Sequence, residues 1–309
     1  RTKDGGQTQD GPNVPNHSGS GNAAWEAPIA YDPNNQMRIY NFSDSIYVSE
    51  DFGSNWTFKG LPASFSGTIN QAAIAENNSD IIIISKNDDI DKSTDGGATF
   101  TSIKGFLPSY SIQDIAFDPN DDDVIIIVYS RYQDDDRKVY ITYNGGTSWN
   151  NITYNLNNMP IHSVVIDHTD SSNIYLGGEI GVYTMPMNGT NWNLYNQNLP
   201  NMAVEELEIV YGSNTLKAAT WGRGLWEFTL DGRQDYPSIT NTSITDMPDG
   251  QKPMVDIDQY VYSTILYDAT LSSVYLEWSA NAPTFGNVIN MTNTSLNDWE
   301  SDAPLPNYP

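Results

Sequence analysis

The feature that most constrains how this chain can fold is an internal repeat of about 45 residues. A short pattern, Ser-x-Asp-x-Gly followed by an aromatic residue three positions later, occurs twice and then a third time with conservative changes. Asp51 and Asp95 are 44 residues apart, and Asn144 follows Asp95 after 49 residues. The three copies comprise Ser49, Asp51, Gly53 and Trp56; Ser93, Asp95, Gly97 and Phe100; and Thr142, Asn144, Gly146 and Trp149.

A degenerate fourth copy and a second motif keep the same period. The fourth copy retains Thr184 and Trp192 but has Pro186 where Asp is expected, and Trp192 follows Trp149 after 43 residues. Because both motifs recur in phase, they indicate a single repeating unit. The second motif occurs as Tyr31-Asp32-Pro33, Ala75-Glu76-Asn77, Phe117-Asp118-Pro119 and Ile166-Asp167-His168.

Each unit contains four short apolar runs separated by turns, with almost no helical periodicity. This pattern predicts a four-stranded antiparallel propeller blade. In the Ser-x-Asp-x-Gly turn, Ser and Asp side chains can accept hydrogen bonds from turn N–H groups, and Gly can adopt a positive φ. We expect the aromatic residue, as in Trp56 and Trp149, to be largely buried and to pack the hairpin onto its blade.

The repeats resemble the Asp-box propellers, also called BNR repeats, of sialidases, xyloglucanase-type glycosidases and sortilin-like secreted proteins. The resemblance covers about residues 25–230. It implies that the boxes are structural and lie away from the ligand face. Residues 220–228, TWGRGLWEF, resemble the last blade of secreted multidomain bacterial proteins of this type.

The predicted fold class is all-β: an incomplete propeller with four to five visible blades, followed by a partial sandwich. Residues 1–24 are interpreted as a loop or the remnant of a preceding blade, and residues 25–235 as the propeller. The period stops near residue 235, and strands are expected at 254–262, 273–279 and 287–291. Residues 236–309 resemble the start of an immunoglobulin or fibronectin type III sandwich with too few strands to close. We therefore expect a fragment of a longer protein.

Composition excludes several partners. The chain has 14 basic and 39 acidic residues, a formal charge of −25, so it cannot form the continuous basic patch that nucleic acid or anionic lipid requires. We expect neutral or cationic partners. The longest aliphatic stretches, at 81–84 and 124–128, have strand length, so no membrane insertion is expected. The absence of cysteine removes disulfides, thiolate metal sites and cysteine nucleophiles.

A ligand site is expected on the face opposite the boxes. In a four-stranded meander, the loops between the second and third strands share one end of the blade with the blade-to-blade connections. These loops carry aromatic, acidic and basic residues suited to a sugar or a protein. The alternative is that these residues are ordinary solvated loop tips. Trp221 and Arg223 could also simply hold the final blade in place. The candidates are Arg131, Tyr132, Asp134, Asp135, Glu179, Trp221 and Arg223.

We assign no catalytic residue. A sialidase needs three arginines converging on one carboxylate, whereas the chain has six arginines and only Arg38, in MRIY, resembles the family's FRIP strand. Other glycosidases use two suitably spaced carboxylates. In xyloglucanase-like enzymes that pair comes from two facing propellers, which one incomplete propeller does not provide.

We assign no metal ligand either. His17, His162 and His168 are scattered, and only His162 falls on the expected ligand face. The acidic clusters at residues 88–91, 118–123 and 134–136 could bind Ca²⁺, but none has the spacing of a known calcium loop. Solvated acidic turns are the favoured interpretation.

The function favoured by the sequence is non-catalytic recognition or adhesion, with a glycan or protein ligand, in a secreted or cell-surface bacterial protein. Two alternatives stay open. One is a segment of a polysaccharide-degrading glycoside hydrolase, xyloglucanase-like rather than sialidase-like. The other is a scaffold that only spaces domains.

Overall fold

The structure is a computed structural model of the 309-residue chain. It describes residues 27–43, 45–60, 68–156, 158–168, 173–196, 198–230, 238–244, 261–266, 274–278, 287–295 and 298–302. The chain divides into two compact units, Arg1–Ile209 with Leu216–Phe228, and Val210–Thr215 with Thr229–Pro309.

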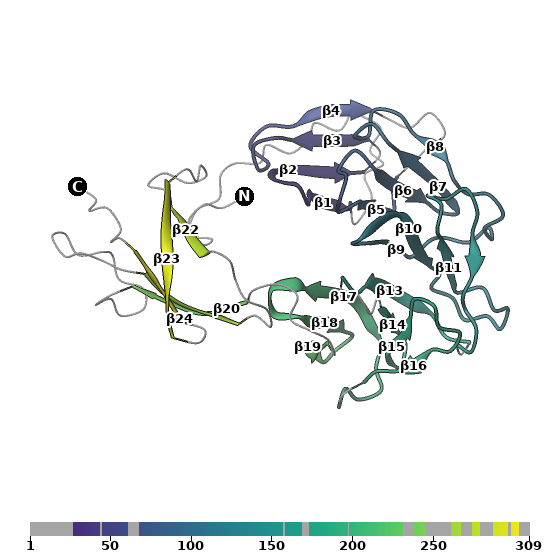
Figure 1. The fold of residues 1–309 in the computed structure, drawn as a ribbon. Helices are drawn as coiled ribbons and strands as arrows, with labels where there is room; N and C mark the ends of the chain where they lie inside the picture. Colours follow the sequence, from purple (N-terminus) through teal and green to yellow (C-terminus); the bar gives the residue numbers. More distant parts are fainter. Residues whose placement is uncertain are drawn as a thin grey trace. The chain divides into compact units, whose positions relative to one another are not determined.

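The first unit contains five successive antiparallel sheets, in each of which the strands lie side by side in chain order. The sheets follow one another along an arc, with the first and fifth at its ends (Figure 1). This arrangement confirms the predicted all-β propeller with almost no helix. The blades are β1 Ile29–Asp32, β2 Asn35–Phe42, β3 Ile46–Ser49 and β4 Thr57–Gly60; β5 Gln71–Ile74, β6 Ile82–Lys86, β7 Asp89–Ser93 and β8 Thr101–Ser102; β9 Asp114–Asp118, β10 Asp121–Val128, β11 Val139–Thr142 and β12 Asn150–Asn151; β13 Ile161–Ile166, β14 Asn173–Gly178, β15 Gly181–Pro186 and β16 Asn193–Leu194; and β17 Val204–Val210, β18 Thr215–Thr220 and β19 Gly224–Thr229.

The hydrophobic core lies between neighbouring blades rather than at a single centre. Strand β10 shows why. Successive side chains of a strand point to opposite faces, and both faces of this blade are covered. Ile125 and Ile127 pack with the second blade, whereas Ile126 and Val128 pack with the fourth. The uninterrupted apolar end of β10 is therefore what a strand buried on both sides requires.

Strand register corrects the alignment of the turn motif in the second blade. Tyr31, Ile74, Phe117 and Ile166 occupy equivalent positions, because they pair with Ile39, Ile82, Ile125 and Ile174 respectively. The residue equivalent to Asp32 is therefore Ala75, not Glu76. The sequence alignment was one residue out because an acidic side chain happens to follow the true position.

Register also corrects the fourth copy of the box. Ile39, Ile82 and Ile125 pair with Ser49, Ser93 and Thr142, and their equivalent Ile174 pairs with Met185. The fourth hairpin thus has Met185 at the Ser position and Met187 at the Asp position, not Thr184 and Pro186. Met185 is buried and Met187 packs against the same cluster. Apolar packing has replaced the polar turn at this blade.

The other three box hairpins, residues 49–56, 93–100 and 142–149, share one hydrogen-bonded geometry. The hydroxyl of the first residue donates to the third residue and accepts the N–H of the Gly. At Ser49 these bonds, to Asp51 and from Gly53, are 2.9 and 2.7 Å long. The distances are 2.8 and 2.9 Å for Ser93, Asp95 and Gly97, and 2.9 and 3.0 Å for Thr142, Asn144 and Gly146.

The box aromatics differ from expectation, because Trp56 and Trp149 are half-buried whereas Trp192 is buried. Two of them tie their blade to the preceding one. The indole Nε1 of Trp149 donates to the carbonyl of Ile103, and that of Trp192 to Ile152, both at 2.8 Å. The box tryptophan therefore fastens neighbouring blades as well as its own hairpin.

A second tie runs forward from the turn between the first two strands of a blade. An asparagine side chain donates to a backbone carbonyl of the next blade. Asn34 bonds to Glu76 O at 3.0 Å, Asn77 to Pro119 O at 2.9 Å, and Asn120 to His168 O at 3.1 Å. The three acceptors occupy equivalent positions, so this contact repeats with the blades.

The second unit contains one antiparallel sheet with the order β20-β21-β24-β23-β22. Its strands are β20 Ser238–Ile244, β21 Val261–Leu266, β22 Val274–Trp278, β23 Asn287–Ser295 and β24 Asp298–Ser301. Strands β22 and β23 match the expected strands at 273–279 and 287–291, whereas residues 254–260 lie outside the described residues. The described part of this unit forms a single layer, so the sandwich stays a prediction.

Within the described ranges, the single helical element is the short 3₁₀ turn Tyr211–Ser213, and no helix is long or apolar enough to cross a membrane.

Candidate functional site

The two ends of the blades are formed by different turns and loops. Each of the first three box hairpins bonds to the start of its blade's second strand, through Phe52 N to Met37 O and the equivalent Gly96 and Gly145 contacts. We call this end the box face. At the other end, blade-to-blade connections bond to the loops between second and third strands, as in Ile112 N to Asn87 O. We call it the loop face, formed by residues 43, 45, 87–88, 129–138, 179–180 and 221–223 with those connections.

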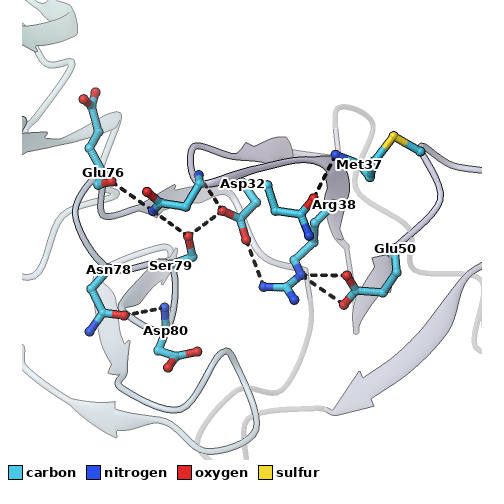
Figure 2. Close-up of polar contacts among 10 residues, drawn as sticks. Asp32, Met37, Arg38, Glu50, Glu76, Asn78, Ser79 and Asp80 are labelled. Carbon is cyan, nitrogen blue, oxygen red and sulfur yellow. Dashed lines mark hydrogen bonds and ion pairs between the residues drawn. The ribbon is translucent and has the colours of Figure 1, made fainter. Parts of the chain in front are cut away.

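Polar groups on the box face bind one another. Asp32 is buried, and its Oδ2 forms an ion pair of 3.0 Å with Arg38 Nη1. Arg38 Nε lies 2.9 Å from Glu50 Oε2 (Figure 2). Ser79 of the second blade donates to the other oxygen of Asp32. These contacts make Arg38 a structural residue, engaged with two carboxylates of its own blade. Because its guanidinium is already paired with Asp32 and Glu50, Arg38 is not arranged to bind the carboxylate of a ligand.

On the loop face, four side chains from the third and fourth blades come together. We call Ser130, Tyr132, His162 and Glu179 the loop-face cluster. Ser130 Oγ and His162 Nδ1 share a hydrogen bond of 3.2 Å. His162 Nε2 lies 3.3 Å from Glu179 Oε1, although not in line for a hydrogen bond. Hydrogen bonding to Glu179 raises the pKa of the Tyr132 hydroxyl, so this exposed ring lies near the carboxylate.

The loop that carries Tyr132 is restrained by contacts of two charged side chains, Arg131 and Lys138. Arg131 stacks over the ring of Tyr110 at 3.2 Å and lies 3.1 Å from Asp135 Oδ2. Lys138 is buried and donates to the carbonyl of Arg131; burial lowers the pKa of Lys138. A cation–π contact and a buried lysine both restrict the loop. We infer that these contacts hold the backbone of the loop in place at Tyr132.

Several polar atoms in this region are buried without a hydrogen-bond partner. They are Tyr129 Oη, Arg131 Nη1, Asp135 Oδ1 and His162 Nε2. Buried polar groups in folded proteins are usually hydrogen-bonded, and leaving one unsatisfied costs about 1–3 kcal/mol. Of these four atoms, His162 Nε2 belongs to the loop-face cluster, and the other three belong to neighbouring residues.

The contacts described for the remaining candidates do not include this cluster. Asp134 is exposed on the same loop. Trp221 is 78% exposed in the turn between β18 and β19, with Arg223 also exposed. Within this hairpin, Trp226 Nε1 donates to Arg223 O at 3.2 Å. The contacts described for Trp221 and Arg223 do not include the loop-face cluster.

The calcium prediction gains no support from the described residues. Among them, no group of three or more His, Asp or Glu side chains is arranged to hold a metal ion. Asp88 instead pairs with Lys104, whose hydrogen bond holds the pKa of Asp88 below its usual value. Asp118 caps its own turn by accepting from Asn120 N at 2.8 Å.

An acidic position also occurs at the loop-face end of the innermost strands. Asp114 Oδ2 accepts the N–H of Val164 in the next blade at 2.8 Å, and the equivalent Ser163 accepts that of Leu207 at 2.9 Å. The Asp114 carboxyl is enclosed although the residue as a whole is half-buried, and this burial raises the pKa of Asp114 to about 7. Its oxygens are occupied by backbone donors, which indicates a role in joining blades.

Comparison with known proteins identifies one matching family. The family model described as "Sortilin, neurotensin receptor 3" matches residues 27–193. No curated protein matches the chain.

Solved structures share the fold at low sequence identity. The GH74 xyloglucanase from Xanthomonas campestris is 11% identical with a TM-score of 0.52, over 85% of this chain and 50% of that one. An ancestral GH74 enzyme is 20% identical with a TM-score of 0.48, over 89% of this chain and 40% of that one. The chain thus spans half or less of the length of these structures, and the likeness concerns the fold alone.

Proposed function

Because the chain belongs to the Sortilin-Vps10 family, we propose that it is a secreted or cell-surface recognition module that binds a glycan or protein ligand without catalysis. The observation that carries this proposal is the loop-face cluster. It combines a 68% exposed Tyr132 ring near Glu179 with the hydrogen-bonded pair Ser130 and His162, in which His162 Nε2 is buried without a hydrogen-bond partner.

The cluster supplies what recognition needs. An aromatic ring with a polar tip offers stacking area at low entropic cost, and carboxylate and imidazole groups give directional hydrogen bonds. Loops on a rigid scaffold are the usual place for binding residues. The chain's charge of −25 favours a neutral or cationic ligand over an anionic one.

The hydrolase alternative is supported by the GH74 likeness in fold only. The carboxyl with a pKa near neutrality, Asp114, has the property expected of a general acid. Its oxygens already accept the N–H groups of Ile115 and Val164 at 2.8 Å. A structural role therefore explains Asp114 better than proton transfer to a substrate.

The test is binding to a printed glycan array and to a displayed library of random peptides. If the parent protein binds a glycan or a peptide in these assays, Tyr132→Ala and Glu179→Gln should each abolish that binding. The melting temperature of each variant should equal that of the parent. Tyr143→Ala is the matched control, because Tyr143 is 48% exposed on the box face. Retention of neither probe class, or binding that only Tyr143→Ala reduces, contradicts the proposal. Release of reducing ends from polysaccharides would contradict the non-catalytic part.

A further inference from the structure

Three partly buried carboxylates at the loop-face end of the blades have their charge compensated within the chain. Asp88 is paired with Lys104, and Asp135 Oδ2 lies 3.1 Å from Arg131 Nη2. Asp114 instead accepts two backbone N–H groups at 2.8 Å. Such partners matter, because a carboxylate that is removed from water without them is destabilising. These three carboxylates therefore need nothing from a ligand.

Glu179 is a fourth such carboxylate, and its surroundings are different. Its side chain is 27% exposed. Within the described ranges, no lysine, arginine or backbone N–H group is paired with it, and its contacts are with the His162 imidazole and the Tyr132 hydroxyl. His162 Nε2 is not in line for a hydrogen bond, so much of the acceptor capacity of this carboxylate is unused. The loop-face cluster thus contains a partly buried negative charge that the described residues do not compensate.

The ring of Tyr132 adds the second feature that a cation site requires. It is 68% exposed and lies near Glu179. The face of an aromatic ring attracts a cation that lies within about 6 Å of the ring centre. The adjacent Arg131 does not use this ring, because its guanidinium stacks over Tyr110 and pairs with Asp135. An exposed ring beside an uncompensated carboxylate is suited to an ammonium or guanidinium group from a ligand.

Two features favour an ammonium group on a flexible stem. Glu179 Oε1 lies 3.3 Å from His162 Nε2, so the two carboxylate oxygens are not both open to the paired N–H groups of a guanidinium. An ammonium needs only one oxygen. The carboxylate is also partly buried, whereas the neighbouring Tyr132 ring is exposed. The methylene stem of a lysine can pack on such a ring while its charged end reaches the carboxylate.

We propose that the loop-face cluster binds a lysine side chain of a protein ligand, with the ammonium group between the Tyr132 ring and the Glu179 carboxylate. This inference rests on the proposed recognition function and specifies its ligand class. An amino sugar carries the same charge, but its ammonium is attached directly to the sugar ring and has no stem with which to reach a partly buried carboxylate. The chain's charge of −25 also attracts a cationic protein over a longer range.

The test begins with a displayed library of random peptides that is selected on the parent chain. Peptides that also bind Glu179→Gln are removed, because they bind elsewhere. The peptides that remain should share a lysine. Each is then synthesised with this lysine either free or acetylated, since acetylation removes the charge and keeps the stem. Chitosan and fully acetylated chitin oligomers are the matched amino-sugar probes.

Acetylation of the lysine should weaken binding to the parent about 100-fold, as expected when one partner of a desolvated charge pair is removed. Glu179→Gln should weaken binding of the free peptide by a similar factor, and the two changes together by little more, because they remove the same ion pair. Tyr132→Leu should weaken binding about 10-fold through loss of the ring. Tyr143→Leu, on the box face, is the control and should bind like the parent. The acetylation comparison needs no protein variant, so it decides the question even if Glu179→Gln affects folding.

Three results overturn the lysine assignment while leaving the recognition function in place. They are peptides that bind equally well when acetylated, a selection in which every peptide also binds Glu179→Gln, and binding of chitosan but not of lysine peptides, which assigns the site to an amino sugar. If the parent retains neither a peptide nor a glycan, the proposed function itself fails, and this inference fails with it.

Discussion

Removing the indole donor from a box tryptophan should weaken the attachment between two blades by a predictable amount. Trp149→Phe deletes the 2.8 Å bond to Ile103 O, and the second blade's Phe100 shows that the hairpin accommodates Phe at this position. The cost should then be mainly that of an unsatisfied carbonyl, about 1–2 kcal/mol for a half-buried site. Trp192→Phe should cost more, about 2–4 kcal/mol, because Trp192 is buried and its ring atoms leave a cavity.

The assay is urea unfolding followed by circular dichroism, with the free energy compared only among variants whose m-value matches the parent. Trp56→Phe is the control, since no acceptor for its indole occurs among the described residues. The expected order of destabilisation is Trp192→Phe, then Trp149→Phe, then Trp56→Phe. If Trp149→Phe and Trp56→Phe are equally stable, the indole bond does not contribute and the reasoning fails.

Three further predictions concern charge. Burial raises the pKa of Asp114 from 3.8 to about 7, so its contribution to stability is lost as pH rises through that range; in urea titrations, the stability of the parent relative to Asp114→Asn should therefore fall between pH 4 and pH 8, by up to about 2 kcal/mol, allowing for partial exposure. Hydrogen bonds from Asn55 and Thr99 lower the pKa of Asp51 and Asp95 to about 2, so both turns should lose stability only as pH falls from about 4 toward 2, and carboxyl NMR titration should show midpoints well below 3.8. Salt should raise the melting temperature by screening the charge of −25, and Ca²⁺ should match Mg²⁺ at equal ionic strength; a saturable effect of Ca²⁺ alone would reveal a specific site.

The repeated motifs could be aligned correctly from the sequence only in the blades that keep the polar residues of the motif. The hydroxyl, carboxylate and Gly of the box are all needed for one hydrogen-bonded turn, so the first three hairpins were found in the correct register. In the second blade Ala75 replaces the buried acid of Asp32, and in the fourth Met185 and Met187 replace the polar pair. A sequence comparison selected polar neighbours there, because strand pairing, which fixes the register, is not visible in one sequence.

The candidate site was predicted in part. The strand order of a blade placed Tyr132, Glu179 and His162 on one face, and the structure brings all three together. Ser130 and the buried Lys138 carry no sequence signal, since a serine ending a strand and a lysine in an acidic loop are both ordinary surface patterns. Which loops contact one another depends on side-chain packing, so the membership of this cluster could not be fully predicted from the sequence.

Both kinds of tie between blades use a backbone carbonyl as the acceptor, reached by an asparagine amide or a tryptophan indole. A carbonyl is present whatever the neighbouring side chain is, as the acceptors Glu76, Pro119 and His168 illustrate. A whole repeat could therefore be duplicated, deleted or exchanged by recombination without matching substitutions in the blade beside it. Under this scheme the number of blades is free to change during evolution, while each blade's sequence needs to preserve only the donors that it carries, such as Asn77 in the second blade or Trp192 in the fourth.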